Sequence, residues 1–154
     1  MKRLFSIILV ALLVVTLTPI QTFATTDIQE NSNVIYYEDG SYVIIELTYD
    51  KETRASGTKS GSKTYKYYNS DDVEQWRAVL SGTFSYTGSS ATCTASSCNV
   101  TISNSAWYVV SKSATKSANV AIGEVTIGRK FLGITVDKES ATIRITCDAN
   151  GNLS

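Results

Sequence analysis

The chain contains no histidine, one proline and three cysteines in 154 residues, and its 14 basic and 14 acidic residues cancel. Without histidine, the sequence cannot form a Ser-His or Cys-His nucleophile pair or an imidazole metal site. Without a basic excess, it lacks the electrostatic signature of a nucleic-acid-binding protein. These absences predict a protein that is not an enzyme, needs no cofactor and does not bind nucleic acid.

An apolar segment follows a short basic start. Lys2 and Arg3 precede the apolar run at 4–17, and a small-residue site ends at Ala24. This order of charge, apolar run and small residue is that of a secretory signal peptide. The run is shorter than the roughly 20 residues that span a bilayer. We expect a Sec-type signal over 1–24, cleaved after Ala24, and a secreted chain with no stable membrane anchor.

The part that follows the signal has the composition of a sheet protein. Cleavage would leave 12 basic and 14 acidic residues, no proline, and 35 serines and threonines. Many hydroxyl, tyrosine and valine side chains with few charges are typical of strands with a polar outer face. No segment outside 1–24 has the period of an amphipathic helix. The sequence therefore predicts an all-β fold.

Alternation of apolar and polar residues marks the expected strands, and turn residues separate them. Ser96-Ser97 is among the expected turns. The predicted strands lie at 34–37, 42–45, 65–68, 73–87, 91–95, 99–103, 107–110, 120–131 and 135–147.

The predicted strands fall into three stretches. Residues 25–50 form an N-terminal segment with a β-hairpin, because Asp-Gly at 39–40 is a strong hairpin-turn signal. Residues 51–62 are rich in glycine, serine and lysine, which is typical of a flexible linker. Residues 63–154 predict two packed antiparallel sheets, an Ig-like or related β-sandwich, with an open barrel as the alternative.

Two of the three cysteines are in phase with apolar residues. Cys93 and Cys147 both point inward on their expected strands, which suits a buried disulfide between the sheets. Trp107 lies between them in the order of immunoglobulin domains, although chance gives the same order and Ile145 replaces the expected tyrosine. A Cys93–Cys98 bridge is the rival pairing, and an intervening hairpin would place those sulfurs diagonally, which is poor disulfide geometry.

Two polar clusters have plain structural explanations. The acidic residues of 71–74 adjoin a turn, whereas glycosidase carboxylates face each other across a cleft, so we expect solvated turn residues. Oxygen-bearing side chains alternate in 148–152 as they do at the start of a calcium loop, but the distal bidentate glutamate is missing. We therefore expect a turn there and no metal site.

Aromatic side chains supply the candidate binding surface. Tyr65, Tyr67 and Tyr68 lie on both faces of one expected strand, so one set must point outward or be covered by another element. Tyrosine and tryptophan offer contact area at low entropic cost. We expect these tyrosines, together with Trp76, to take part in binding; core packing and cross-strand pairing are the alternative.

Five short strings carry a resemblance. As a set they resemble a family of small, uncharacterised exported proteins of Gram-positive, anaerobic gut-type bacteria, over most of 34–154. The resemblance implies that Cys93 and Cys147 are paired and that Cys98 is an extra thiol; it implies no activity. The strings are YEDGSY at 37–42, TKSGSKTY at 58–65, GTFSY at 82–86, SSATCT at 89–94 and TCDANG at 146–151.

We expect a secreted, non-enzymatic β-sandwich that binds a glycan or a protein at or outside the cell surface. The alternative is a small exported bacteriocin-like effector. In that case the hairpin at 34–49 and the 51–62 segment form a pro-region that is cleaved near Arg54. Two buried carboxylates across one cleft would instead indicate an enzyme.

Overall fold

All regular structure in the computed structural model is β-strand. The structure describes residues 28–50 and 55–154, so the predicted signal peptide at 1–24 lies outside the described residues. The all-β prediction is confirmed for the described part of the chain. The strands are β1 (Ile28–Tyr36), β2 (Tyr42–Asp50), β3 (Gly57–Tyr68), β4 (Glu74–Tyr86), β5 (Ala91–Ile102), β6 (Trp107–Ser117), β7 (Val120–Phe131) and β8 (Ile134–Thr146).

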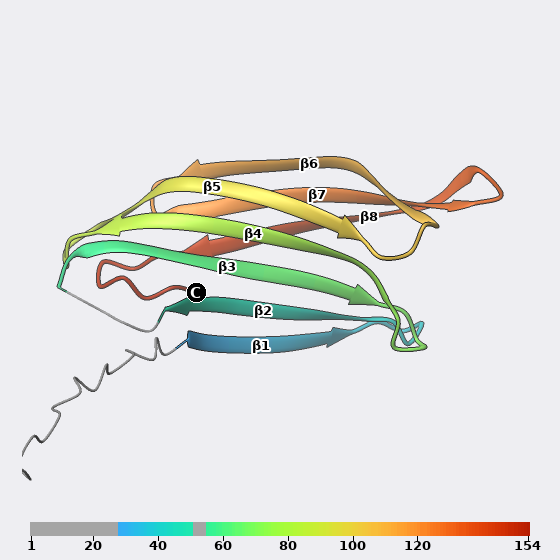
Figure 1. The fold of residues 1–154 in the computed structure, drawn as a ribbon, viewed down its shortest axis with the longest axis horizontal. Helices are drawn as coiled ribbons and strands as arrows, with labels where there is room; N and C mark the ends of the chain where they lie inside the picture. The colour runs from blue at the N-terminus through green and yellow to red at the C-terminus, as the bar shows by residue number, and fades with distance from the viewer. Residues whose placement is uncertain (1–27, 51–54) are drawn as a thin grey trace, which may run out of the picture.

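The eight strands form two antiparallel sheets. One has the order β1-β2-β3-β4-β5 and the other the order β6-β7-β8, and Figure 1 shows them as two layers. Each described strand pairs only with its neighbours in sequence, so both sheets are meanders. Immunoglobulin domains have Greek-key connections, and the described strands have none.

One core lies between the sheets. Along β4 the side chains of Trp76, Ala78 and Leu80 are buried in alternation, as a half-buried strand requires. From the smaller sheet, Ile127 and Ile145 pack into the same cluster. Each fully buried side chain of this size contributes about 1.5–3 kcal/mol, and together they hold the two sheets against each other.

The stretch predicted as a flexible linker is a strand from Gly57 onward. Residues 57–62 begin β3 and pair with β4 along their whole length. Gly61 is present for close packing, because a Cβ there would collide with Leu153 Cδ1. The low apolar content of the stretch reflects a polar outer face and an inner face that holds Gly57, Gly61 and the buried Lys59. Residues 51–54 of the predicted linker lie outside the described residues.

The N-terminal hairpin belongs to the larger sheet. β2 pairs with β3 from Tyr42 to Tyr49, and it buries the side chains of Val43 and Leu47. The sequence left open whether this hairpin joins the main sandwich, and the structure places its described strands in the same sheet as β3, β4 and β5. None of the described residues forms a helix with the length and hydropathy needed to cross a membrane.

Four turns gather at one end of the molecule. They lie at 37–41, 69–73, 103–106 and 132–133, at the right of Figure 1. We call this the hairpin end. At the opposite end the C-terminal segment turns back, and Thr146 and Ser154 exchange two backbone hydrogen bonds of 2.9 and 3.0 Å.

Candidate functional site

The four aromatic residues singled out in the sequence do not form one surface. Tyr65, Tyr67 and Trp76 face the core side of the larger sheet, and Trp76 is only 2% exposed. Trp76 shares the inward phase of its strand, which makes it a core residue and not a contact residue. Tyr68 faces outward and stacks on Tyr42, with ring centroids 5.0 Å apart.

The inward-facing rings form an aromatic stack with Trp107. Tyr65 and Tyr67 lie parallel to the Trp76 ring at centroid distances of 5.7 and 5.6 Å. Tyr67 also meets Trp107 edge to face at 5.5 Å. Trp107 is buried, as expected, and its Nε1 donates a 3.1 Å hydrogen bond to Gln75 Oε1. These contacts hold the half-buried Tyr67 ring in a fixed orientation.

A cleft of about 270 Å³ lies beside this stack at the hairpin end. Its wall combines the β1–β2 turn, β3 of the larger sheet and β8 of the smaller sheet. The Asp39-Gly40 turn, with Gly40 at φ 82°, brings the side chains of the β1–β2 turn into the cleft. The lining residues are Tyr37, Glu38, Asp39, Ser41, Tyr67 and Glu139.

Tyr37 forms the exposed wall of the cleft. Its hydroxyl lies 3.1 Å from the hydroxyl of Tyr65, and its ring centroid lies 6.3 Å from that of Tyr67. Burial raises the pKa of Tyr65 and of Tyr67, so both phenols stay protonated at neutral pH. The cleft therefore presents two fixed aromatic rings and hydroxyl groups that can donate or accept hydrogen bonds.

The pKa values of two carboxylates in the cleft are shifted in opposite directions. The Ser41 hydroxyl and backbone N–H donate to Asp39 Oδ1 at 2.6 and 3.0 Å, and these bonds lower the pKa of Asp39. Burial raises the pKa of Glu139, and the nearby charges of Asp137 and Asp39 raise it further. Asp39 is exposed, so the cleft does not hold the two buried carboxylates that would indicate a glycosidase.

Sequence reasoning missed Tyr37, Asp39 and Glu139 as a group. The Asp-Gly signal identified the turn correctly, but nothing local marks its side chains as lining a cleft. Glu139 reaches the cleft only because β8 of the second sheet packs behind β3. That long-range placement has no signal in a single sequence.

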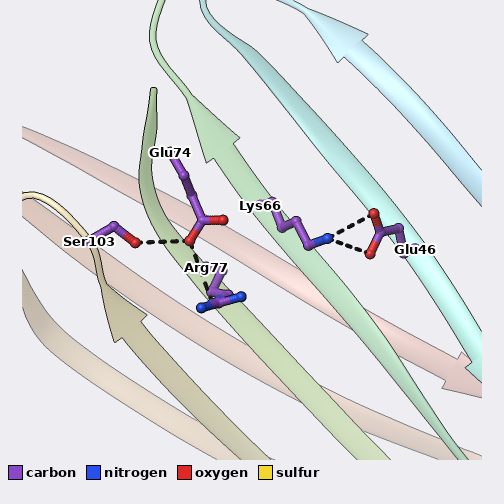
Figure 2. Close-up of polar contacts among 5 residues, drawn as sticks. All are labelled: Glu46, Lys66, Glu74, Arg77 and Ser103. Carbon is purple, nitrogen blue, oxygen red and sulfur yellow. Dashed lines mark hydrogen bonds and ion pairs between the residues drawn. The ribbon is translucent and has the colours of Figure 1, made fainter. Parts of the chain in front are cut away.

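Asp71 and Asp72 are exposed turn residues, as predicted, whereas Glu74 begins β4 and lies partly buried on the outer face. Figure 2 shows the Glu74 carboxylate accepting a 2.9 Å hydrogen bond from Ser103 Oγ and pairing with Arg77 Nε at 3.5 Å. Lys66 and Glu46 form a second ion pair on the same face, with a shortest N–O distance of 2.7 Å. Exposed pairs of this kind contribute about 0–1 kcal/mol each.

The segment 148–152 is a turn. Asp148 Oδ1 accepts the backbone N–H groups of Asn150 and Asn152, both at 2.8 Å, and Asp148 Oδ2 accepts the Asn152 side-chain amide at 2.7 Å. These bonds lower the pKa of Asp148 and occupy its oxygens. Among the residues that the structure describes, no group of three acidic or cysteine side chains could hold a metal ion.

The predicted disulfide is not formed in the structure, which contains three free thiols. Cys93 and Cys147 are nevertheless neighbours, because their backbone N–H groups donate to the consecutive carbonyls of Ala118 and Asn119 at 2.7 and 3.0 Å. Both lie in the common core. Burial is the main cause that raises the pKa of Cys147, and the nearby charge of Asp148 raises it further.

The rival Cys93–Cys98 pairing does not fit the backbone. The turn predicted at Ser96-Ser97 is wrong, because β5 runs without a break from Ala91 to Ile102. Five residues along a strand separate the two Cα atoms by about 16 Å, whereas a disulfide requires less than about 7 Å. The half-buried Cys98 lies opposite Leu80 on β4 and points into the core.

The cleft thus offers aromatic rings on one side and carboxylate oxygens at its rim. Such a set suits a small ligand with one apolar face and several hydroxyl donors. No protein-family model matches the sequence, and neither the curated proteins nor the solved structures compared with the chain give a significant match.

Proposed function

We propose that this chain is a secreted, non-enzymatic β-sandwich that binds a glycan through the cleft at its hairpin end. The observation that carries the proposal is the exposed Tyr37 ring facing Tyr67, with Asp39 and Glu139 at the rim of the same cleft. A sugar ring has an apolar C–H face that packs on aromatic rings and hydroxyl groups that donate to carboxylates.

The aromatic rings of the cleft are held in place before any ligand binds. Tyr67 is held by two tryptophans, and Tyr37 is tied to Tyr65 through their hydroxyls. Side chains that are already ordered lose little entropy on binding. The volume of about 270 Å³ lies just below the range of about 300–1,000 Å³ for drug-sized ligands, which favours a single sugar ring in the cleft.

The expected affinity is weak. A hexose has about 12 non-hydrogen atoms, and at about 0.3 kcal/mol per atom its binding free energy is about 4 kcal/mol. This corresponds to a Kd of about 1 mM for one ring. Longer glycans gain affinity only where further sugars reach the neighbouring turns.

A glycan array with residues 25–154, followed by NMR titration of the best ligand, tests the proposal. Tyr37→Ala should weaken binding at least tenfold, because it removes the exposed ring that is 43% accessible. Tyr36→Ala is the matched control: it is the neighbouring tyrosine, 75% exposed, and its ring packs on Tyr42 outside the cleft. Absence of glycan binding, or equal losses in both variants, would contradict the assignment.

Secretion is part of the same proposal, with cleavage after Ala24 and membership in the exported family that the sequence resembles. N-terminal sequencing of the protein from a culture supernatant should give Thr25 as the first residue. The alternative, a bacteriocin-like effector released near Arg54, has less support. Its cut would remove β1 and β2, and with them the buried side chains of Val43 and Leu47.

We also propose that Cys93 and Cys147 become a disulfide after export. An exported disulfide donor would accept the two electrons and two protons that the thiols lose, becoming a dithiol itself. A bond closing a loop of this length stabilises by about 4 kcal/mol on the chain-entropy model. Non-reducing peptide mass spectrometry should find the two cysteines linked and Cys98 free to react with an alkylating reagent after unfolding.

A further inference from the structure

The β7–β8 hairpin ends in an exposed apolar tip. Figure 1 shows it projecting past the ends of the other strands. Apolar side chains normally face the core on such a strand pair, but here they lie beyond any covering sheet. We call this group the hairpin tip. Its members are 56–88% exposed: Phe131, Leu132, Ile134 and Val136.

The turn itself carries a residue that its backbone disfavours. Leu132 and Gly133 have φ values of 49° and 81°, which is the pattern of a type I′ turn. Asparagine, aspartate or glycine normally takes the first of these positions, because a branched side chain is strained at positive φ. Leu132 makes the turn less favourable and places an apolar side chain that is 88% exposed in solvent. Strained positions of this kind often occur at functional sites, and among the described non-glycine residues with positive φ, Leu132 is the one with a large apolar side chain.

Basic side chains lie directly behind the tip. Residues 129–138 contain Arg129, Lys130 and Lys138 against a single acid, Asp137, and so carry a local charge of +2. All three cations are exposed. Lys130 precedes Leu132 of the turn by two residues, about 7 Å at strand spacing. That distance matches the depth of about 5–10 Å to which interfacial segments enter a bilayer.

Aromatic rings hold two of these cations in place. The Arg129 guanidinium lies 5.7 Å from the ring centroid of Trp107, and Lys130 Nζ lies 4.6 Å from that of Tyr108. Apolar side chains at the tip followed by ordered cations is the arrangement that the surface of an anionic bilayer favours.

We propose that the hairpin tip inserts reversibly into the surface of an anionic lipid bilayer. A protein partner fits the tip less well, because a specific interface buries about 800 Å² per partner and a two-stranded ribbon offers only its narrow end. A bilayer needs no complementary shape. The acidic turns at 37–41 and 69–73 end short of the tip (Figure 1), so the tip meets the bilayer first. The glycan cleft plays no part in this contact.

Vesicle co-sedimentation of residues 25–154 tests the proposal. This chain contains every described strand and omits the apolar 4–17 run, which would itself enter lipid. It should bind vesicles of equal parts phosphatidylglycerol and phosphatidylcholine, and bind pure phosphatidylcholine much more weakly. Lys130→Glu should lower the affinity for the anionic vesicles about fivefold, and added salt should weaken the contact.

Leu132→Asn is the decisive variant. Asparagine accepts positive φ, so the thermal midpoint should stay the same or rise, while binding to anionic vesicles should fall about tenfold. The matched control is Val34→Thr, which replaces an exposed apolar side chain on β1 of the other sheet and should bind as the parent does.

Three results would overturn the proposal. The parent chain could fail to sediment with anionic vesicles, Leu132→Asn could bind as tightly as the parent, or Val34→Thr could lose as much binding as Leu132→Asn. A tip that captured a defined protein but ignored vesicles would assign it to a protein partner instead.

Discussion

Replacing Trp76 by phenylalanine should cost little stability, although Trp76 is the largest fully buried side chain in the core. Its indole N–H is buried and has no hydrogen-bond acceptor among the described residues, and such a donor costs about 1–3 kcal/mol. Phenylalanine removes that donor and keeps a ring between Tyr65 and Tyr67. The lost contact area offsets the gain, so the net change should stay within about 1 kcal/mol.

Trp107→Phe is the matched comparison. Trp107 Nε1 donates to Gln75 Oε1, an acceptor that also receives the Asn104 side-chain amide at 2.7 Å. The substitution therefore loses one hydrogen bond of about 1 kcal/mol in addition to the same loss of ring area. We expect a total cost of about 2–3 kcal/mol, with the greater loss at Trp107 and not at Trp76.

Urea unfolding followed by circular dichroism measures both changes in the free energy of unfolding. In a thermal scan, a domain of this size should shift its Tm by about 4 °C per kcal/mol, so the Tm values of the two variants should also differ. Trp76→Ala should cost more than either, about 3–5 kcal/mol, because it leaves a cavity between two stacked rings. If Trp76→Phe destabilised the protein as much as Trp107→Phe, the account of the unpaired indole would be wrong.

Two further predictions concern a close approach in the core and the pH response of the cleft. Gly82→Ala should destabilise the fold by about 1–3 kcal/mol in the same unfolding assay, because the new Cβ would lie 2.8 Å from the Phe84 ring and 3.0 Å from Ala121 Cβ. Glycan affinity, followed by titration, should fall as the pH drops through the raised pKa of Glu139, while Asp39, whose pKa is lowered, keeps its charge to lower pH. Glu139→Gln should bind more weakly at neutral pH and lose this early step; an unchanged pH profile would remove Glu139 from the site.

The pKa of Glu139 also affects stability, with the opposite sign to that of Asp39. The folded state holds the Glu139 proton more tightly than the unfolded chain does. The stabilisation that protonated Glu139 gives the fold is therefore fully present below the unfolded pKa and is lost as the pH rises through the folded pKa. The contribution of Asp39 is present above its unfolded pKa and is lost as the pH falls through its lowered folded value.

The sequence predicted the strands wherever apolar residues alternate clearly. The expected strands at 73–87 and 135–147 match β4 and β8 within a residue. Two of the errors, the linker predicted over 57–62 and the turn predicted at Ser96-Ser97, fall on stretches of small polar residues. Glycine and serine lower strand propensity locally, but pairing with neighbouring strands outweighs that preference here.

The candidate site was less predictable than the fold. Of the aromatic residues predicted to bind, Tyr67 lines the cleft, whereas Trp76 is buried in the core, because a tryptophan looks the same in a sequence whether it lies in a core or on a surface. Glu139 and Tyr37 lie about 100 residues apart in the chain, and only the packing of the two sheets brings them together. Periodicity reports which way a side chain points along one strand, and it says nothing of what lies across from it.

The unbroken course of β5 bears on the order in which bonds form as the chain emerges. In a chain released amino end first, β1–β5 are available before β6–β8, so the thiols of Cys93 and Cys98 are both present before that of Cys147. Because β5 is extended, it keeps those two sulfurs too far apart to join. The disulfide proposed above would therefore have to wait for Cys147, which follows the last strand.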